Sequence, residues 1–297
     1  MPVAVLTDST AYLPPDLAER YGIHVVPLYV VLAGHSGREG EDISSEDVAR
    51  ALSSRGQRVS TSRPTPGDFV AAYRAALDAG ADRLVSVHLS AELSGTWDAA
   101  RVAASQVGEH IVSVVDSRSA AMGTGFAVLA AARAAAGGAD LDTVARVARE
   151  AAARTRTLFV VDTLEHLRRG GRIGSAAAVF GSALAVKPVL HVVDGRVVPL
   201  EKVRTSARAF NRLVQHVVEL AGERQVSLAV HHLAAAERAE RLVTELRERV
   251  PGLCELHVSE LGAAIGAHVG PGAVGVVVSH VAPGTAPPSG GEQPPGE

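Results

Sequence analysis

The stretch RLVSVHLSAELSGTWDAARVAA, residues 83–104, predicts a β-strand, a short loop and an α-helix in succession. Its beginning is rich in branched apolar side chains, and its end has the composition and period of a helix. Similar strand candidates alternate with helical segments through the first half of the chain, at residues 3–7, 23–31 and 110–116. This alternation predicts a three-layer α/β domain built on a parallel sheet.

The second half of the chain carries strand candidates that are connected differently. They are the β-branched runs at residues 157–161, 186–193, 196–203, 225–233 and 273–279. Asp194-Gly195 separates two of these runs and favours a tight hairpin, whereas the first half shows only connections of crossover length. We therefore expect antiparallel pairing, and with it a mixed sheet, in a second α/β domain.

These differences divide the chain into three segments. A length of 297 residues suits two domains, because a domain typically takes about 150 residues. We expect an N-terminal α/β domain at 1–156 and a C-terminal α/β domain at 157–280. Residues 281–297 are rich in proline and glycine and are expected to be a disordered tail.

The composition excludes several classes of function. Lys and Arg number 29 against 32 Asp and Glu, so the chain lacks the basic excess that drives general nucleic-acid binding. Cys254 is the single cysteine, which excludes an internal disulfide and Cys-rich metal sites. Metal-binding and nucleotide-binding motifs are missing, so we expect neither a metal nor a cofactor. The sequence has no signal-peptide pattern and no stretch suited to a membrane span, and we expect a cytoplasmic protein.

Three loops concentrate small hydroxyl residues where strands are expected to end, which is where open α/β sheets bind ligands. They are Thr7–Thr10, Ser60–Pro66 and Leu89–Thr96. In the third loop, Ser94 and the amides of Gly95 and Thr96 are expected at the positive end of a helix, which favours an anion. Capping and turn formation explain the same residue types, so both interpretations stay open.

Two further loops are candidates for binding. LEHLRRGGRIG, residues 164–174, combines three arginines with three glycines, and it is either a dock for an anion or acidic partner or a solvated basic turn. GAHVGPG, residues 266–272, places His268 among glycines that permit close approach of a ligand to the backbone. A purely structural histidine is the alternative there.

Seven motifs occur in order and at compatible spacing between residues 3 and 279. They are TDSTAYLPPDL, STSRPTP, LSGTWDAAR, VVDSRSAAMGTG, LEHLRRGGRIGSAAAVFGSALAVKPVL, DGRVVPLEKVRT and IGAHVGPGAVG. Together they resemble the DegV family of bacterial lipid-binding proteins. The resemblance implies the two-domain fold of that family, with one long-chain fatty acid held between the domains. It also implies a carrier without catalytic residues, which presents the carboxylate to the catalytic subunit of a fatty acid kinase for acyl-phosphate formation.

The same resemblance implies roles for individual residues. Around the carboxylate we expect Thr61, Ser62, Ser94, Gly95, Thr96 and His268. A one-residue register step decides whether Thr61 or Ser62 points inward. Arg172 and Arg204 are expected to face the kinase partner or its phosphates, and Val179, Phe180 and Leu184 to line the path of the tail. Ala91-Glu92 and Arg63 depart from the family pattern near the head group.

Two other functions remain open at this point. A serine hydrolase or acyltransferase is the alternative from the enzyme class, with Ser94 as nucleophile and His268 as base. The sequence around Ser94 lacks the GxSxG pattern of common serine hydrolases, so such a pair would be unorthodox. Binding of another small amphiphile is the third possibility.

Overall fold

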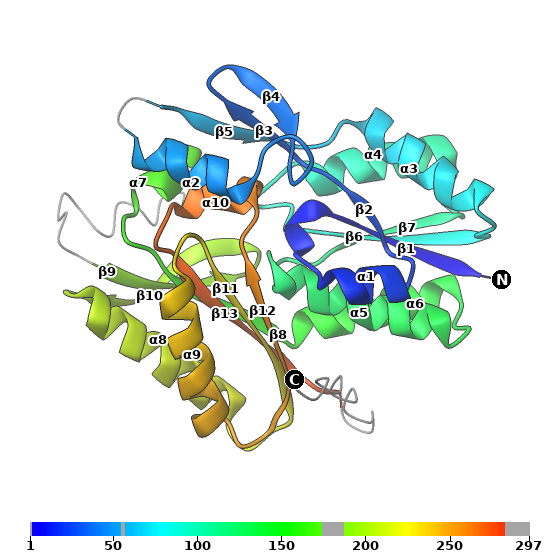
Figure 1. The fold of residues 1–297 in the computed structure, drawn as a ribbon. Helices are drawn as coiled ribbons and strands as arrows, with labels where there is room; N and C mark the ends of the chain where they lie inside the picture. The colour runs from blue at the N-terminus through cyan, green and yellow to red at the C-terminus, as the bar shows by residue number, and fades with distance from the viewer. Residues whose placement is uncertain (1, 55–56, 174–186, 283–297) are drawn as a thin grey trace, which may run out of the picture.

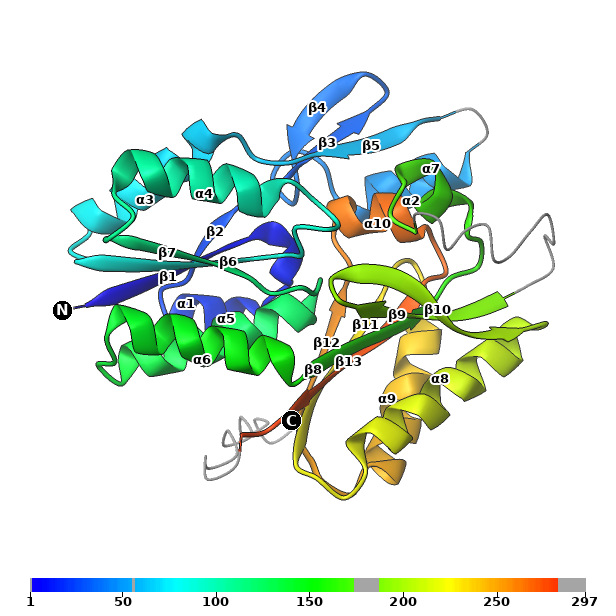
Figure 2. The same ribbon diagram turned by 180° about the vertical axis from the view of Figure 1, so that it is seen from behind.

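The computed structural model describes residues 2–54, 57–173 and 187–282, and within these ranges the strands form three sheets (Figure 1, Figure 2). Val179, Phe180 and Leu184, the residues expected to line the path of the acyl tail, lie outside the described residues. So does the predicted C-terminal tail beyond Ala282. The prediction of a parallel sheet followed by a mixed sheet is confirmed.

A parallel four-stranded sheet forms the centre of the N-terminal half, in the order β2-β1-β6-β7. Its strands are β1 (Val3–Asp8), β2 (His24–Val26), β6 (Arg83–His88) and β7 (Val112–Asp116). One face packs against α3 (Pro66–Asp78) and α4 (Thr96–Val107), and the other against α1 (Pro15–Arg20), α5 (Met122–Ala136) and α6 (Leu141–Ala153). The result is the expected three-layer arrangement (Figure 1).

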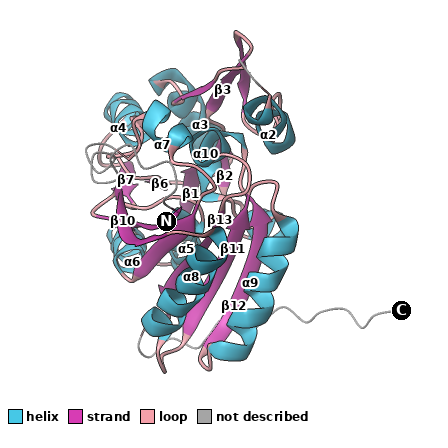
Figure 3. Ribbon diagram, turned by 90° about the vertical axis from the view of Figure 1, so that its left-hand side faces the viewer, coloured by secondary structure: helices cyan, strands magenta, loops and turns pink. Residues whose placement is uncertain are grey.

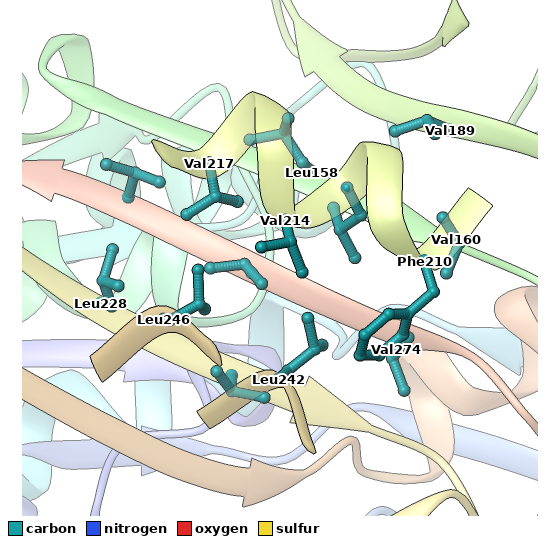
Figure 4. Packing of buried hydrophobic residues seen from close by; sticks show 14 of the residues in the cluster. Leu158, Val160, Val189, Phe210, Val214, Val217, Leu228, Leu242, Leu246 and Val274 are labelled. Carbon is teal, nitrogen blue, oxygen red and sulfur yellow. The ribbon is translucent and has the colours of Figure 1, made fainter. Parts of the chain in front are cut away.

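A six-stranded mixed sheet forms the second half, in the order β10-β9-β8-β13-β11-β12. Its strands are β8 (Thr155–Val160), β9 (Lys187–Val193), β10 (Arg196–Val203), β11 (Val226–His232), β12 (Leu253–Glu260) and β13 (Val274–His280). Two helices, α8 (Ser206–Ala221) and α9 (Ala236–Arg249), cover one face (Figure 3). Phe210, Val214, Leu242 and Leu246 pack there against the strands (Figure 4). The opposite face turns toward the N-terminal half.

A small antiparallel sheet and three short helices lie beside the two larger sheets (Figure 2). Its strands are β3 (Tyr29–Leu32), β4 (His35–Arg38) and β5 (Val59–Ser62), and the helices are α2 (Ser45–Ser53), α7 (Glu165–Gly170) and α10 (Ala263–Val269). A single turn of 3-10 helix, η1 (Ser9–Ala11), follows β1. α10 packs against α2 and β3, so a helix from the C-terminal half shares a hydrophobic cluster with the small sheet.

Two predictions for the first half are wrong. Residues 23–31 are not one strand, because the chain leaves the parallel sheet after Val26 and enters the small sheet at Tyr29. Pro27 lies at the break, where it lacks the N–H that a continuing strand needs. The first half also contains a hairpin, β3–β4, whose turn residues Ala33 and Gly34 both have positive φ. An Ala-Gly pair is a weaker hairpin signal than Asn-Gly or Asp-Gly.

The turn at Asp194-Gly195 is confirmed, since it joins the antiparallel strands β9 and β10 and both residues have positive φ, 50° and 80°. β12 has no counterpart among the predicted strands. It is an edge strand, and Glu255 and His257 interrupt its apolar residues in the way that sheet edges are protected.

The carboxylate of Asp8 fixes the carboxyl ends of β1 and β6. Its Oδ2 accepts from the backbone N–H of Leu89 and lies 2.9 Å from Nδ1 of His88. Its Oδ1 accepts from the backbone N–H and the hydroxyl of Thr10. Nε2 of His88 lies in turn 2.6 Å from Oγ of Ser86. Asp8, His88 and Thr10 are all completely buried, so every one of these polar groups depends on its protein partner.

We expect Asp8→Ala to lower the free energy of unfolding by about 3–5 kcal/mol, because it leaves several buried donors without an acceptor. Chemical denaturation measures this change. The exposed Asp78 near the end of α3 provides the control, and Asp78→Ala should change stability by less than about 0.5 kcal/mol. Equal effects of the two substitutions would contradict the role assigned to Asp8.

Candidate functional site

An apolar cavity of about 910 Å³, partly open to solvent, lies where the three sheets approach one another. Thr10 and Leu89 line it from just beyond the carboxyl ends of β1 and β6, where open α/β sheets bind ligands. Phe159 and Val277 line it from the inner face of the six-stranded sheet, and Ile265 lines it from α10. Leu, Val, Ile and Ala make up most of the remaining lining, which is typical of a site for an apolar ligand.

Polar side chains occur at only a few positions of this lining. They are Thr10, Thr61, Ser94, Thr157, Arg172, His231 and His268. Each of the three hydroxyl-bearing loops singled out in the sequence contributes one of them. Within the described part of the chain, Arg172 is the only Lys, Arg, Asp or Glu that lines the cavity. One permanent positive charge therefore faces an otherwise apolar space.

Among the residues that line the cavity, His268 contacts Thr61, and His268 and Arg172 both contact Gly170. Oγ1 of Thr61 and Nε2 of His268 lie 2.8 Å apart. Nε of Arg172 donates to the carbonyl of Leu93 at 3.1 Å, and its Nη1 donates to the carbonyl of Gly170. The imidazole of His268 occupies the space that a Cβ on residue 170 would need, so glycine is required there. This arrangement brings β5, the end of α7, α10 and the β6–α4 loop together.

His268 is a neutral histidine in this environment. Burial, with a further contribution from the charge of Arg172, lowers the pKa of His268 to about 4. Its Nδ1 is buried and has no partner among the described residues. Burial also lowers the pKa of Arg172, yet a guanidinium keeps its proton at neutral pH. The two residues thus offer different chemistry, since one supplies a hydrogen bond without charge and the other supplies the charge.

A buried carboxylate holds α10, and with it His268, in place. Oε1 of Glu39 accepts from the backbone N–H of Ala264 at 2.8 Å and from the hydroxyl of Tyr12 at 3.0 Å. Its Oε2 accepts from the hydroxyl of Ser9. Burial raises the pKa of Glu39. Glu39 directly follows β4. Its carboxyl group therefore links the small sheet to the segment after β1 and to the start of α10.

The remaining residues expected at the head group are placed differently. Ser94 lines the cavity, and its Oγ also accepts from the backbone N–H of Thr96 and lies 2.8 Å from the hydroxyl of that residue. Thr96 is completely buried, and neither it nor Gly95 lines the cavity. The N-cap of α4 is Gly95, without a side-chain cap, so the capping interpretation of Ser94 is wrong, whereas its bond to the N–H two residues on fits the turn interpretation.

Thr61 and Ser62 lie on opposite sides of β5. Thr61 is opposite the buried Val30 in the register of the small sheet and lines the cavity, whereas Ser62 is exposed. Of the two arginines expected at a partner, Arg172 lines the cavity and Arg204 is exposed just before α8.

Sequence reasoning did not single out two of the polar lining residues, Thr157 and His231. His231 is buried in β11, where its Nε2 accepts from the backbone N–H of Met122 at 3.2 Å and its Nδ1 lies 3.0 Å from Oγ of Ser259. Burial lowers the pKa of His231 to about 4. Both side chains lie inside strands, and only the packing of the two halves of the chain reveals which way they point.

In the ranges that the structure describes, no group of three or more His, Cys, Asp or Glu side chains is arranged to hold a metal ion. Likewise, none of the helices in those ranges has both the length and the apolar character that crossing a membrane requires.

Comparison with known proteins shows the same family over nearly the whole chain. The DegV family model matches residues 2–281. A DegV domain-containing protein of Streptomyces coelicolor is 55% identical over 277 residues, which cover 93% of this chain and 98% of that protein. Among solved structures, a fatty-acid-binding DegV family protein from Thermus thermophilus matches with a TM-score of 0.89 and 35% identity, covering 95% of this chain and 100% of that chain. DegV of Bacillus subtilis, a fatty acid binding protein, matches with a TM-score of 0.85, the same identity and the same coverage.

The low pKa values of His231 and His268 predict a loss of stability in mild acid. An unfolded histidine takes up a proton near pH 6.5, whereas these two remain neutral to about pH 4, so the unfolded state binds more protons between those values. We expect each histidine to lower the free energy of unfolding by about 1.5 kcal/mol as the pH falls from 6.5 to about 5.

Denaturant titrations at several pH values measure this dependence. His268→Gln should reduce the slope of stability against pH over that window, and His231→Gln should do the same. An unchanged slope in both variants would contradict the assignment of two neutral, buried imidazoles.

Proposed function

The chain belongs to the DegV family, and from that premise we propose that it binds one long-chain fatty acid in the cavity, with the carboxylate beside Thr61, Ser94 and His268. The observation that carries this proposal is a largely apolar cavity into which the described residues place one charged side chain, that of Arg172. The Thermus thermophilus and Bacillus subtilis relatives, which bind fatty acids, support the ligand class.

The apolar lining suits the tail of such a ligand. Burying a chain of about 14 methylenes at about 0.8 kcal/mol each gives a gross driving force on the order of 11 kcal/mol before ordering costs. The tail therefore supplies most of the affinity.

The carboxylate needs compensation, because removing an ionised group from water costs several kcal/mol. A hydrogen bond to a charged group returns about 1.5–3 kcal/mol, so two or three donors are required. The hydroxyls of Thr61 and Ser94 are the neutral donors, with His268 holding the hydroxyl of Thr61, and Arg172 supplies the opposite charge. We therefore extend the role of Arg172 from a partner contact to the electrostatic partner of the bound head group.

The geometry does not favour the serine hydrolase. A catalytic serine needs a histidine within hydrogen-bond reach and a third group that orients that histidine. Here Ser94 bonds to Thr96, His268 bonds to Thr61, and Nδ1 of His268 has no carboxylate partner in the described ranges. Ser86, His88 and Asp8 are hydrogen-bonded in the order of a catalytic triad. All three side chains are fully buried, however, and none lines the cavity.

We propose further that the chain is a carrier rather than an enzyme, and that it presents the carboxylate to a separate kinase that forms the acyl phosphate. Arg172 and His268 line the cavity just after α7 and within α10; arginine and glycine gather at the end of α7, and glycine follows α10. Arg204 is exposed outside the cavity and is available to a phosphate or an acidic surface. This role accounts for an exposed arginine that the fatty acid itself does not require.

Thr61 and Ser62 provide a matched pair for testing the binding site. We expect Thr61→Val to lower the affinity for palmitate about tenfold or more, because it removes one hydrogen bond to a charged group while keeping the shape of the side chain. Ser62→Ala should change the affinity by less than about twofold, because Ser62 is exposed. Titration calorimetry of delipidated protein measures both. Equal losses in both variants, or absence of palmitate binding by the unaltered chain, would overturn the proposed site.

Arg204 separates binding from presentation. We expect Arg204→Met to leave the dissociation constant for palmitate unchanged and to lower acyl-phosphate formation at least tenfold when the chain is combined with a fatty acid kinase catalytic subunit and ATP. Arg247→Met, which changes another exposed cation of the same half, serves as the control for general charge effects. Full acyl-phosphate formation by the Arg204 variant would contradict the docking role.

A further inference from the structure

β8 and β9 are paired over only part of their length. Three residue pairs join them, Leu158 with His191, Phe159 with Leu190 and Val160 with Val189. Beyond Leu158 the ladder stops, although β8 extends back to Thr155 and β9 extends forward to Val193. Thr157 and Val192 would form the next pair and do not. The mixed sheet therefore has a gap between these two strands.

The apolar cavity meets a second, larger hollow at this gap. The second hollow, which we call the outer groove, has a volume of about 1730 Å³, partly open solvent, and lies between the β7–α5 loop, the end of α6, β9 and α8. Charged and polar side chains line much of it, among them Arg118, Arg149, Arg156, His191 and His216. Thr157, Leu158 and Val192 line both the cavity and the outer groove. These three residues are the partition between them.

Thr157, on the partition, lies well along the six-stranded sheet from α10 and His268. β13 starts just after α10, and the chain lines the cavity from Ala273, the residue before β13, to Val277. At about 3.3 Å per residue these four steps cover roughly 13 Å. Val277 is paired with Thr157, so Thr157 lies beside the far end of this stretch of β13, counted from α10. On one side, Oγ1 of Thr157 lies 3.0 Å from Oγ of Ser119, and the pair packs against α5 at Gly123, where a Cβ would collide with both side chains.

We propose that the partition sets the longest acyl chain that the cavity accepts, with Val192 and Thr157 as the residues that determine this specificity. The inference rests on the proposed function, and it assigns the methyl end of the bound chain to the gap between β8 and β9. Up to the partition, each added methylene of the fatty acid is transferred from water to the apolar lining of the cavity, which raises the affinity about fourfold. Beyond it, the tail enters the outer groove, where arginine and histidine side chains stand among the apolar ones, and further methylenes gain less than they do inside the cavity.

The test measures dissociation constants for saturated fatty acids of increasing length. The unaltered chain should show affinity that rises about fourfold per methylene and then levels off or falls at a definite length. Val192→Ala should move this break to chains about two carbons longer, because it removes two methyl groups from the partition. Val192→Phe should move the break to shorter chains. Thr157→Ala provides a second, independent widening of the same gap.

Val193→Ala is the matched control. Val193 follows Val192 on β9 and lines the outer groove without lining the cavity, so its substitution should leave the break where it is. Thermal unfolding of each variant shows whether it folds, and the three partition variants together keep the test valid if one of them does not. A break that stays at the same length in all folded partition variants would overturn the inference. Absence of binding by the unaltered chain at every length would instead overturn the proposed function.

Discussion

Two buried carboxylates, Asp8 and Glu39, determine whether the cavity exists at all. Asp8 ties the ends of β1 and β6 together, and the two residues that it bonds through their backbone N–H groups, Thr10 and Leu89, both line the cavity. Glu39 likewise fixes the start of α10, the helix that carries His268, by accepting from a backbone N–H there. A buried carboxylate is costly unless all of its lone pairs are used, and here loops from distant parts of the sequence supply the donors. The walls of the cavity are thus fixed by hydrogen bonds that lie behind the lining rather than in it.

Local sequence signals correctly predicted structural features that depend on neighbouring residues, such as turns. They failed for features that depend on residues far along the chain, such as strand register and the direction of a side chain. Asp194-Gly195 predicted its hairpin because the backbone itself must adopt positive φ there. The direction of Thr61 required the register of β3 with β5, which places it opposite Val30. The expectation of one strand at 23–31 failed because two sheets compete for that apolar run, and Pro27 decides where it divides. Likewise, nothing in the composition of RRGGRIG distinguishes an arginine that faces solvent from one that faces a cavity.

Charge and hydrogen bonding are divided between two side chains that line the cavity. A histidine with a pKa of about 4 stays neutral throughout the neutral range, so it can orient the hydroxyl of Thr61 without adding a second positive charge. Arg172 alone keeps its charge, and part of its donor capacity is already committed to the carbonyls of Leu93 and Gly170. An anion there meets a guanidinium held in place by backbone oxygens. Its binding should therefore depend little on pH between about 6 and 8, since neither group titrates in that range.

β9 stays paired with β10 up to the turn that contacts the β6–α4 loop. At that turn the hydroxyl of Ser90 donates to the carbonyl of Gly195, and Arg196 pairs with Glu92. Val197 then lines the cavity from β10. The ladder between β9 and β8, by contrast, ends after three pairs. Beside Thr157 and Val192 the cavity is therefore bounded by side chains instead of a continuous ladder, and side chains can change in size without changing the fold.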